Sequence, residues 1–107
     1  GCYNLIFSSS ATVYGIANIS PIPEKAKIDP INPYGKTKAY IESFLSDLWK
    51  SNSLWKIRIL RYFNPVGCHS SGLLGEESTG NNGNLFPIIC NAAMDNSKYQ
   101  YEYSIGK

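Results

Sequence analysis

The chain has 107 residues, of which 43% are hydrophobic and 17% are charged, and its formal net charge is +2. These values are typical of a globular domain or of part of one, since most domains contain roughly 100 to 150 residues. Lysine and arginine occur singly rather than in a basic patch, which argues against a nucleic acid partner. No segment approaches the roughly 20 apolar residues that a bilayer span needs, so we expect no membrane partner.

The three cysteines, Cys2, Cys68 and Cys90, are widely separated and show no Cys-x-x-Cys spacing. This argues against both a disulfide framework and a structural zinc site, and it favours a reducing, cytoplasmic location. The first residues, "GCYNLIFSSS", lack the charged region and cleavage pattern of a signal peptide. Because the chain does not begin with Met and opens directly into an apolar run, we expect it to be a fragment of a longer protein.

The first half of the chain predicts a strand, a long loop and a helix. The apolar run 2–7 is short enough for a strand buried on both faces. The segment 16–33 contains four prolines and predicts an irregular loop. Asn32 then predicts a helix cap, with Pro33 at the first helical position. Apolar residues recur on one face through the segment 33–50, which predicts a helix of that length.

The second half continues the alternation of strands and helices. Branched and aromatic residues between 54 and 65 predict a strand ended by an Asn-Pro pair, so the first three elements form a βαβ unit with parallel strands. The segment 67–84 contains five glycines and predicts an extended loop. Asn84 predicts the cap of a second, shorter helix. Alternating aromatic and polar residues at 99–105 predict a further strand.

Polar side chains follow both strands of the predicted βαβ unit. Residues 8–12 follow the first strand and Asn64 follows the second, and ligands of open parallel sheets bind beyond these carboxyl ends. Tyr34 and Lys38 are four residues apart at the start of the intervening helix, so both lie on one face of it. A phenol is a weak base at neutral pH, but a nearby ammonium favours its ionised form. The pair therefore predicts a tyrosine general base.

Each of these residues also has a purely structural interpretation. Lys38 could pair with Glu42 one turn further on, and Tyr34 could be a packing residue at the start of the helix. Serines at the end of a strand often satisfy local backbone groups. His69 is the only histidine and has no carboxylate or cysteine partner in metal-ligand spacing, so we expect a hydrogen-bonded loop residue and no metal site.

The order and spacing of four motifs resemble the extended short-chain dehydrogenase/reductase superfamily. The motifs are "FSSSATVYG", "NPYGKTKAYIE", "LRYFNPVGCHSSGLLGE" and "NLFP", and their wording is similar to the UDP-glucose (UDP-galactose) 4-epimerase family. Relatives that dehydrate nucleotide sugars carry Thr-Asp-Glu where this chain has Ser10, Ala11 and Thr12, so no acid for elimination is present there. One departure from the epimerase pattern is Gly83, which stands where the family has an asparagine.

The resemblance implies an α/β fold in which the chain is a fragment of a Rossmann-like parallel sheet. Residues 1–66 would form the C-terminal part of the NAD-binding domain, and residues 67–107 would begin the nucleotide-sugar-binding region. Tyr34 would act as the base, Lys38 would bind the nicotinamide ribose and favour the ionised tyrosine, and Ser10 would hydrogen-bond the reacting hydroxyl. The implied cofactor-binding residues are Ser10, Tyr34, Lys38, Tyr62 and Phe63. The implied substrate-binding residues are Ser10, Ala11, Thr12, Tyr34, Asn64, Asn84 and Leu85.

The implied activity is the NAD-dependent interconversion of UDP-glucose and UDP-galactose through a transient 4-keto sugar, by a longer enzyme that is a homodimer. The fragment alone would be inactive. Two alternatives remain open at this point. One is a sister enzyme of the superfamily that acts on another UDP-sugar. The other is an inactive remnant or a nucleotide-sugar-binding module.

Overall fold

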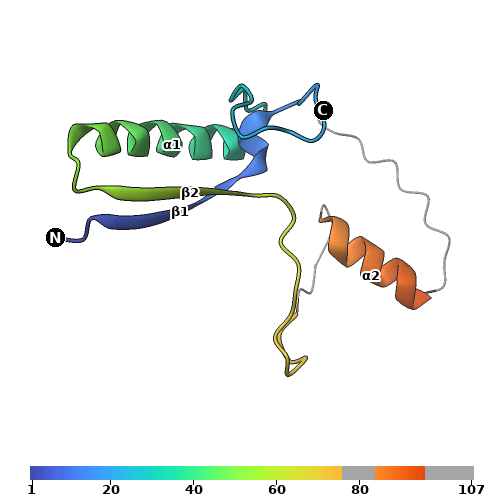
Figure 1. Ribbon diagram of the computed structural model, residues 1–107. Coiled ribbons are helices and arrows are strands. Elements are labelled where there is room, and N and C mark those ends of the chain that lie inside the picture. The colour runs from blue at the N-terminus through green and yellow to red at the C-terminus, as the bar shows by residue number, and fades with distance from the viewer. Residues whose placement is uncertain (76–83, 96–107) are drawn as a thin grey trace. The chain divides into compact units, whose positions relative to one another are not determined.

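A computed structural model describes residues 1–75 and 84–95. Its elements are β1 (Asn4–Ser10), the 3-10 helix η1 (Ala11–Tyr14), α1 (Pro33–Ser51), β2 (Lys56–Tyr62) and α2 (Leu85–Asp95) (Figure 1). The order confirms the predicted α/β class and the strand, loop, helix, strand succession. The strand predicted at 99–105 lies outside the described residues. The chain divides into two compact units, of which the first is Gly1–Phe63 and the second begins at Asn64.

The two strands form a parallel pair, as the βαβ pattern predicts. Asn4 lies opposite Lys56 and Ser10 lies opposite Tyr62, so the strands are in step from end to end. The serine run belongs to β1 itself rather than following it, which corrects the predicted strand end at residue 7. Because the strands are parallel, both carboxyl ends lie at the same edge of the sheet, where Ser10 and Tyr62 are neighbours.

The expectation of a strand buried on both faces is wrong. Burial alternates along β1, where the Ile6 side chain is 66% exposed and Ser9 is 3% exposed. Figure 1 shows α1 along one side of the strand pair, which accounts for the buried face. The apolar run of β1 lacks the alternation of a half-buried strand, but the strand nevertheless has one exposed face.

The start of α1 follows the predicted cap. The Asn32 side-chain oxygen accepts a hydrogen bond from the backbone N–H of Gly35 at 2.7 Å, and Pro33 is the first helical residue. Asn32 thus satisfies one of the N–H groups that the first helical turn leaves without a partner. The helix ends at Ser51, one residue beyond the predicted end.

The buried face of α1 differs from the predicted apolar stripe. Leu45 is buried, but Phe44 and Trp49, which the stripe includes, are 65% and 56% exposed. Glu42 is buried instead. The sheet face below this turn of the helix carries polar partners for a carboxylate, and for that reason a charged side chain can occupy a core position.

The loop before α1 folds back onto η1. The backbone N–H of Asp29 donates to the carbonyl of Val13 at 3.0 Å, and Val13 is fully buried. Gly15 has φ +62°, and a Cβ atom there would lie 2.0 Å from the Asp29 carbonyl oxygen. A side chain at residue 15 would therefore be strained in its backbone and would clash. This contact holds an otherwise irregular segment in place.

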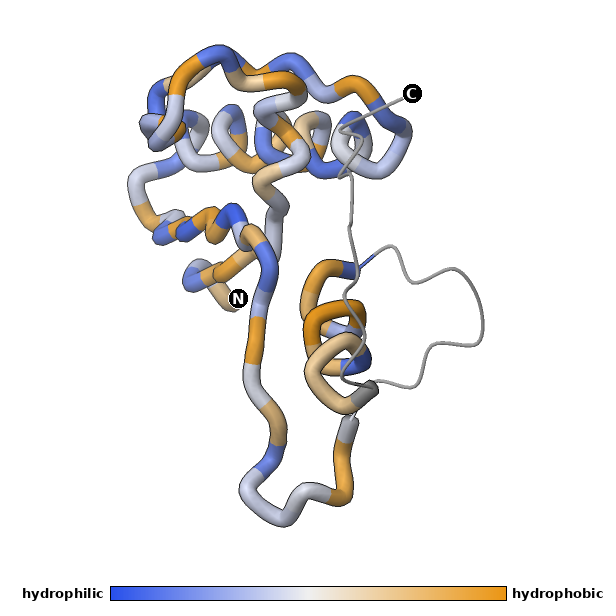
Figure 2. Tube along the Cα trace, turned by 90° about the vertical axis from the view of Figure 1, so that its right-hand side faces the viewer, coloured by the Kyte–Doolittle hydropathy of each residue, from blue (hydrophilic) through white to orange (hydrophobic). Residues whose placement is uncertain are grey.

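The second predicted helix is also confirmed, since α2 begins at Leu85, directly after Asn84. Figure 2 shows that α2 is coloured mostly as hydrophobic, as its sequence "LFPIICNAAMD" requires. In the loop that precedes it, His69 Nδ1 lies 2.9 Å from the Ser71 hydroxyl, which confirms the predicted hydrogen-bonded loop histidine.

Candidate active site

Ser10, Ala11 and Thr12 lie where β1 passes into η1. The Ser10 side-chain oxygen accepts hydrogen bonds from the backbone N–H of Thr12 at 3.2 Å and from the Thr12 hydroxyl at 2.9 Å. Both bonds use lone pairs of the Ser10 oxygen, so its own proton can be donated to a ligand. Ala11 and Thr12 are the first two residues of η1. The β1 end thus presents an oriented hydroxyl.

The first turn of α1 lies directly against η1. Gly35 is buried, and a Cβ atom at this position would lie 2.8 Å from the Thr12 carbonyl oxygen and 3.0 Å from Pro30 Cβ. Only a glycine allows the two backbones to approach this closely. The same turn carries Tyr34, whose side chain is 56% exposed and open to a ligand.

Lys38 contacts two groups of β1 and one of its own helix. Its ammonium donates to the carbonyl of Ser8 at 2.8 Å and lies 5.0 Å from the centre of the Phe7 ring. It also lies 5.5 Å from the centre of the Tyr34 ring, within the range of a cation–π contact. The structure therefore brings Tyr34 and Lys38 together beside the end of β1. The alternative in which Lys38 pairs with Glu42 is wrong, because Glu42 pairs with Arg61.

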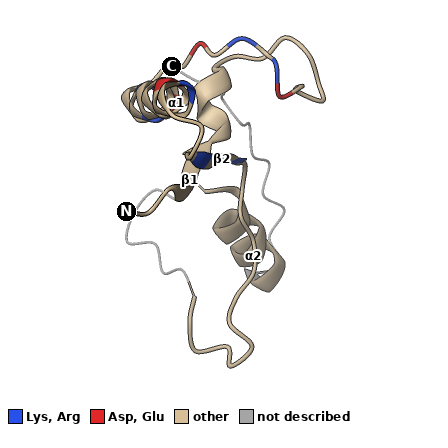
Figure 3. Ribbon diagram, turned by 60° about the vertical axis from the view of Figure 1, so that its left-hand side comes forward, with Lys and Arg blue, Asp and Glu red and all other residues tan. Residues whose placement is uncertain are grey.

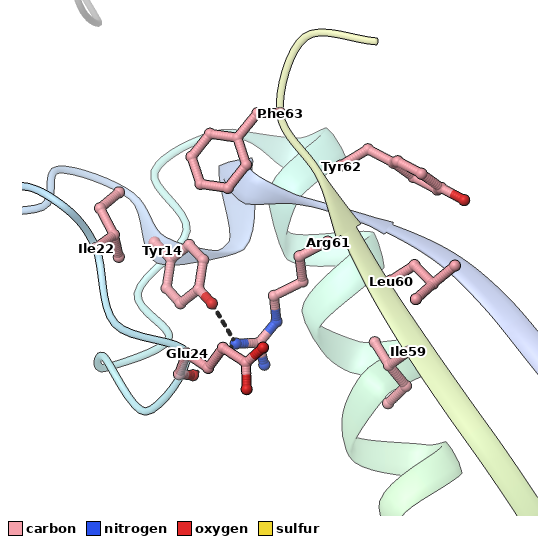
Figure 4. Close-up of a pocket in the computed structure, with 8 residues that line it drawn as sticks. All are labelled: Tyr14, Ile22, Glu24, Ile59, Leu60, Arg61, Tyr62 and Phe63. Atoms are coloured by element: carbon pink, nitrogen blue, oxygen red, sulfur yellow. Dashed lines mark hydrogen bonds between the residues drawn. The ribbon is translucent and has the colours of Figure 1, made fainter.

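Tyr62 is the last residue of β2 and Phe63 follows it; the two residues are 46% and 64% exposed. Both line a hollow of about 570 Å³ that Tyr14, Glu24 and Arg61 also line (Figure 4). The other candidate residues, Asn64, Asn84 and Leu85, belong to the unit that begins at Asn64, where Leu85 is the first residue of α2.

The sequence did not lead us to predict a buried ion pair between Glu42 and Arg61 in this region. Arg61 Nη2 lies 2.6 Å from Glu42 Oε2, Arg61 Nε donates to Oε1 at 3.0 Å, and the Ser9 hydroxyl donates to the same carboxylate. Figure 4 shows the guanidinium reaching the Tyr14 hydroxyl, to which it donates at 2.8 Å. The strand alternation could have placed Arg61 on the helix-facing side of β2 with Ile57 and Ile59, but it does not identify Glu42 as the partner.

The charges of this pair stabilise one another. Burial raises the pKa of Glu42, but hydrogen bonds from Arg61 and Ser9 and the charge of Arg61 outweigh burial, so the net pKa lies below its ordinary value. The hydrogen bond to Glu42 raises the pKa of Arg61. Both groups are therefore ionised at neutral pH.

Among residues 1–75 and 84–95, the remaining charges do not gather into one surface. Figure 3 shows basic residues on α1, on β2 and in the loop before α1.

The three cysteines are free and exposed. Over residues 1–75 and 84–95, no helix is long and apolar enough to cross a membrane.

A parallel βαβ unit with a Tyr-x-x-x-Lys pair beside a strand end is typical of Rossmann-like folds of the short-chain dehydrogenase/reductase type. The family model described as GDP-mannose 4,6 dehydratase matches residues 2–104, and the chain belongs to this family.

Individual proteins are also similar to the chain in sequence. It is 51% identical over 94 residues to "UDP-glucose 4-epimerase 2" of Arabidopsis thaliana, a match that covers 88% of this chain and 27% of that protein. It is 53% identical over 94 residues to "Bifunctional protein gal10" of Schizosaccharomyces pombe, covering 84% of this chain and 13% of that protein. The chain thus spans about a quarter or less of the length of these relatives.

A solved structure agrees with the same class. The UDP-glucose 4-epimerase of Stenotrophomonas maltophila, crystallised with NAD and formylated UDP-arabinopyranose, matches with a TM-score of 0.75 and 45% identity. The match covers 88% of this chain and 28% of that structure.

Proposed function

We propose that the protein to which this chain belongs is an NAD-dependent UDP-hexose 4-epimerase that interconverts UDP-glucose and UDP-galactose. The observation that carries the proposal is the placement of Tyr34 and Lys38 beside the end of β1, in a chain about 50% identical to a UDP-glucose 4-epimerase. The name of the fission-yeast relative and the ligands of the bacterial neighbour support a role in galactose metabolism with NAD as cofactor.

The residues present fit a nicotinamide cofactor. Lys38 supplies an ammonium at the carboxyl edge of a parallel sheet, where such ligands bind, and Tyr62 and Phe63 offer exposed aromatic surface at the same edge. Ser10, Tyr34 and Lys38 would meet the nicotinamide end, together with Tyr62 and Phe63. When bound, NAD supplies a reversible acceptor for the C4 hydride, so that a transient 4-keto sugar can receive the hydride back on its other face.

The chain's own residues handle the proton in this scheme. Tyr34 takes the proton from the sugar 4-hydroxyl and gives it back after the sugar has turned, and Ser10 hydrogen-bonds the same hydroxyl. The Lys38 ammonium offsets the negative charge on the phenol oxygen while the proton is absent. Ala11 and Thr12 line the sugar side, and Asn64, Asn84 and Leu85 contribute neutral donors and apolar contact to the nucleotide.

Epimerisation is favoured over dehydration by the residues at the start of η1. Elimination of water needs an acid beside the sugar. Ala11 and Thr12 carry none, and the Thr12 hydroxyl is bonded to Ser10. The family contains dehydratases by its description, but this segment lacks the group that their reaction requires.

The remaining parts of the proposal concern the whole protein. We place it in the cytoplasm, supported by three free cysteines. We expect a homodimer, and we assign residues 1–66 to the NAD-binding domain and residues 67–107 to the start of the nucleotide-sugar-binding region.

The test is an assay of the complete gene product. It should convert UDP-glucose to UDP-galactose and the reverse with bound NAD and no added reductant. A panel of N-acetylated UDP-hexoses and UDP-pentoses separates this activity from that of a sister epimerase. If the protein is folded and contains NAD but turns over none of these sugars, the remaining interpretation is a nucleotide-sugar-binding module without catalysis.

A further inference from the structure

One buried carboxylate connects the three segments that carry the candidate site. Glu42 belongs to α1, accepts a hydrogen bond from Ser9 of β1 and is paired with Arg61 of β2. Glu42 is 4% exposed and Ser9 is 3% exposed, so water does not compete for these contacts. Ser9 and Arg61 lie opposite each other in the strand register. The Glu42 carboxylate therefore contacts both residues of one facing pair in the two strands.

Each member of this network is close in the chain to a candidate site residue. Ser9 precedes Ser10, and Arg61 precedes Tyr62. Glu42 is one helical turn after Lys38, on the same side of α1. A shift of the Glu42 carboxylate would therefore move the Ser10 hydroxyl, the Lys38 ammonium and the end of β2 together.

The guanidinium extends the network to η1 and to the loop before α1. Arg61 Nη1 donates to the Tyr14 hydroxyl at 2.8 Å and to the Glu24 carbonyl at 3.0 Å, in the loop before α1. Arg61 uses both Nε and Nη2 toward Glu42, which fixes direction as well as distance. A buried pair of this kind is often no more stabilising than two apolar side chains of equal volume. Its particular contribution is a defined geometry.

We propose that Glu42 is a positioning residue whose pairing with Arg61 and Ser9 sets the alignment of Ser10, of the Tyr34–Lys38 pair and of the β2 end. The inference rests on the proposed epimerase function for its kinetic effect. Its structural content, the local fixing of the two strand ends, stands independently. A misplacement of about 1 Å between reacting groups can lower a rate on the order of a hundredfold.

The experiment compares four forms of the complete gene product. They are wild type, Glu42→Gln, the double variant Glu42→Met/Arg61→Met, and the control Asp47→Asn. Asp47 lies on the same helix in an exposed pair with Lys50. Each form is measured for kcat, for KM with UDP-glucose, for thermal midpoint and for amide hydrogen exchange over residues 8–12 and 59–63.

The positioning role predicts that the variants can recover thermal stability without recovering kcat. Glu42→Gln should lose about tenfold or more in kcat with KM within twofold, and its strand-end amides should exchange several-fold faster. The double variant removes both buried charges, so its thermal midpoint should return toward wild type while kcat stays low. It also keeps the test decisive if Glu42→Gln alone does not fold. Asp47→Asn should match wild type in all four measurements.

Two results would overturn the inference. In the first, kcat of the double variant recovers together with its thermal midpoint, as expected of a merely structural pair. In the second, hydrogen exchange at the strand ends is unchanged in the folded variants. If wild type turns over no UDP-sugar, the proposed function fails, and hydrogen exchange alone decides for or against the positioning role.

Discussion

The ammonium of Lys38 lies 5.5 Å from the centre of the Tyr34 ring while it donates to the Ser8 carbonyl at 2.8 Å. The strand thus anchors the cation, and the helix presents the phenol next to it. A lysine held only by its flexible stem would leave this neighbourhood through rotamer changes. Anchoring the cation on β1 keeps the positive charge beside the phenol before any ligand arrives.

Replacing Tyr34 by phenylalanine should abolish most of the activity and leave the fold intact. Proton transfer by a positioned side chain contributes about 10² to 10⁴ in rate, and the variant removes only a hydroxyl from a side chain that is 56% exposed. The measurement is kcat with UDP-glucose beside circular dichroism and NAD content. Tyr40→Phe is the control, since Tyr40 lies on the same helix and is 73% exposed. Equal rates for Tyr34→Phe and wild type would exclude a general base at this position.

Replacing Lys38 by methionine removes the charge and keeps most of the stem. We expect a fall in kcat of at least about tenfold, because the Tyr34 ring loses its neighbouring cation and the anchor to Ser8 disappears. The loss in unfolding free energy should be about 1 kcal/mol, the contribution of one hydrogen bond. Lys36→Met, at an exposed position of the same helix, controls for lost charge. A control variant that is equally slow would contradict a specific role for Lys38.

Gly35→Ala should destabilise the protein although alanine is the better helix former. The added methyl group would lie 2.8 Å from the Thr12 carbonyl oxygen, so the first turn of α1 must move away from η1. Overpacking costs about 1 to 3 kcal/mol, which exceeds the propensity gain of about 1 kcal/mol. Urea unfolding measures the difference. Gly75→Ala is the matched control, since nothing lies within 4 Å of its added Cβ, and a stabilised Gly35→Ala would show that the close approach is absent.

Asn32→Ala should lower the unfolding free energy by about 1 kcal/mol, because the Gly35 N–H loses its capping acceptor. Asn32→Asp keeps an acceptor oxygen and should retain wild-type stability. Thermal unfolding of the three forms gives the comparison. If the aspartate variant is as unstable as the alanine variant, the cap is not the cause.

The contribution of Glu42 to stability should depend on pH in the acid range. Although burial raises the pKa of Glu42, its bonds to Arg61 and Ser9 bring the net pKa below its ordinary value of 4.5. Its charge therefore stabilises the fold fully above about pH 4.5, and this stabilisation is lost as pH falls through the lower folded pKa. The unfolding free energies of wild type and Glu42→Gln, measured between pH 3 and 7, should converge at the acid end. A difference that does not change with pH would contradict the assignment.

Local pattern was sufficient to predict the two strands and the helix of the first unit, although not the end of β1 or the 3-10 helix η1. The Asn32 cap, the start of α1 at Pro33 and the parallel pairing of the strands follow from short-range signals and from chain connectivity. The Tyr-x-x-x-Lys spacing likewise places both side chains on one helix face, because helical geometry depends only on sequence separation. These features could be read without any knowledge of what surrounds them.

The partners of the buried charges depended on tertiary structure alone. Nothing in the spacing of Glu42 distinguishes an exposed pair with Lys38 from a buried pair with Arg61, which is 19 residues away. The register sets Ser9 opposite Arg61. It thereby decides which face of β1 is covered and why Glu42 rather than Phe44 enters the core. Burial and charge pairing are properties of residues brought together from different segments, and a one-dimensional pattern does not contain that proximity.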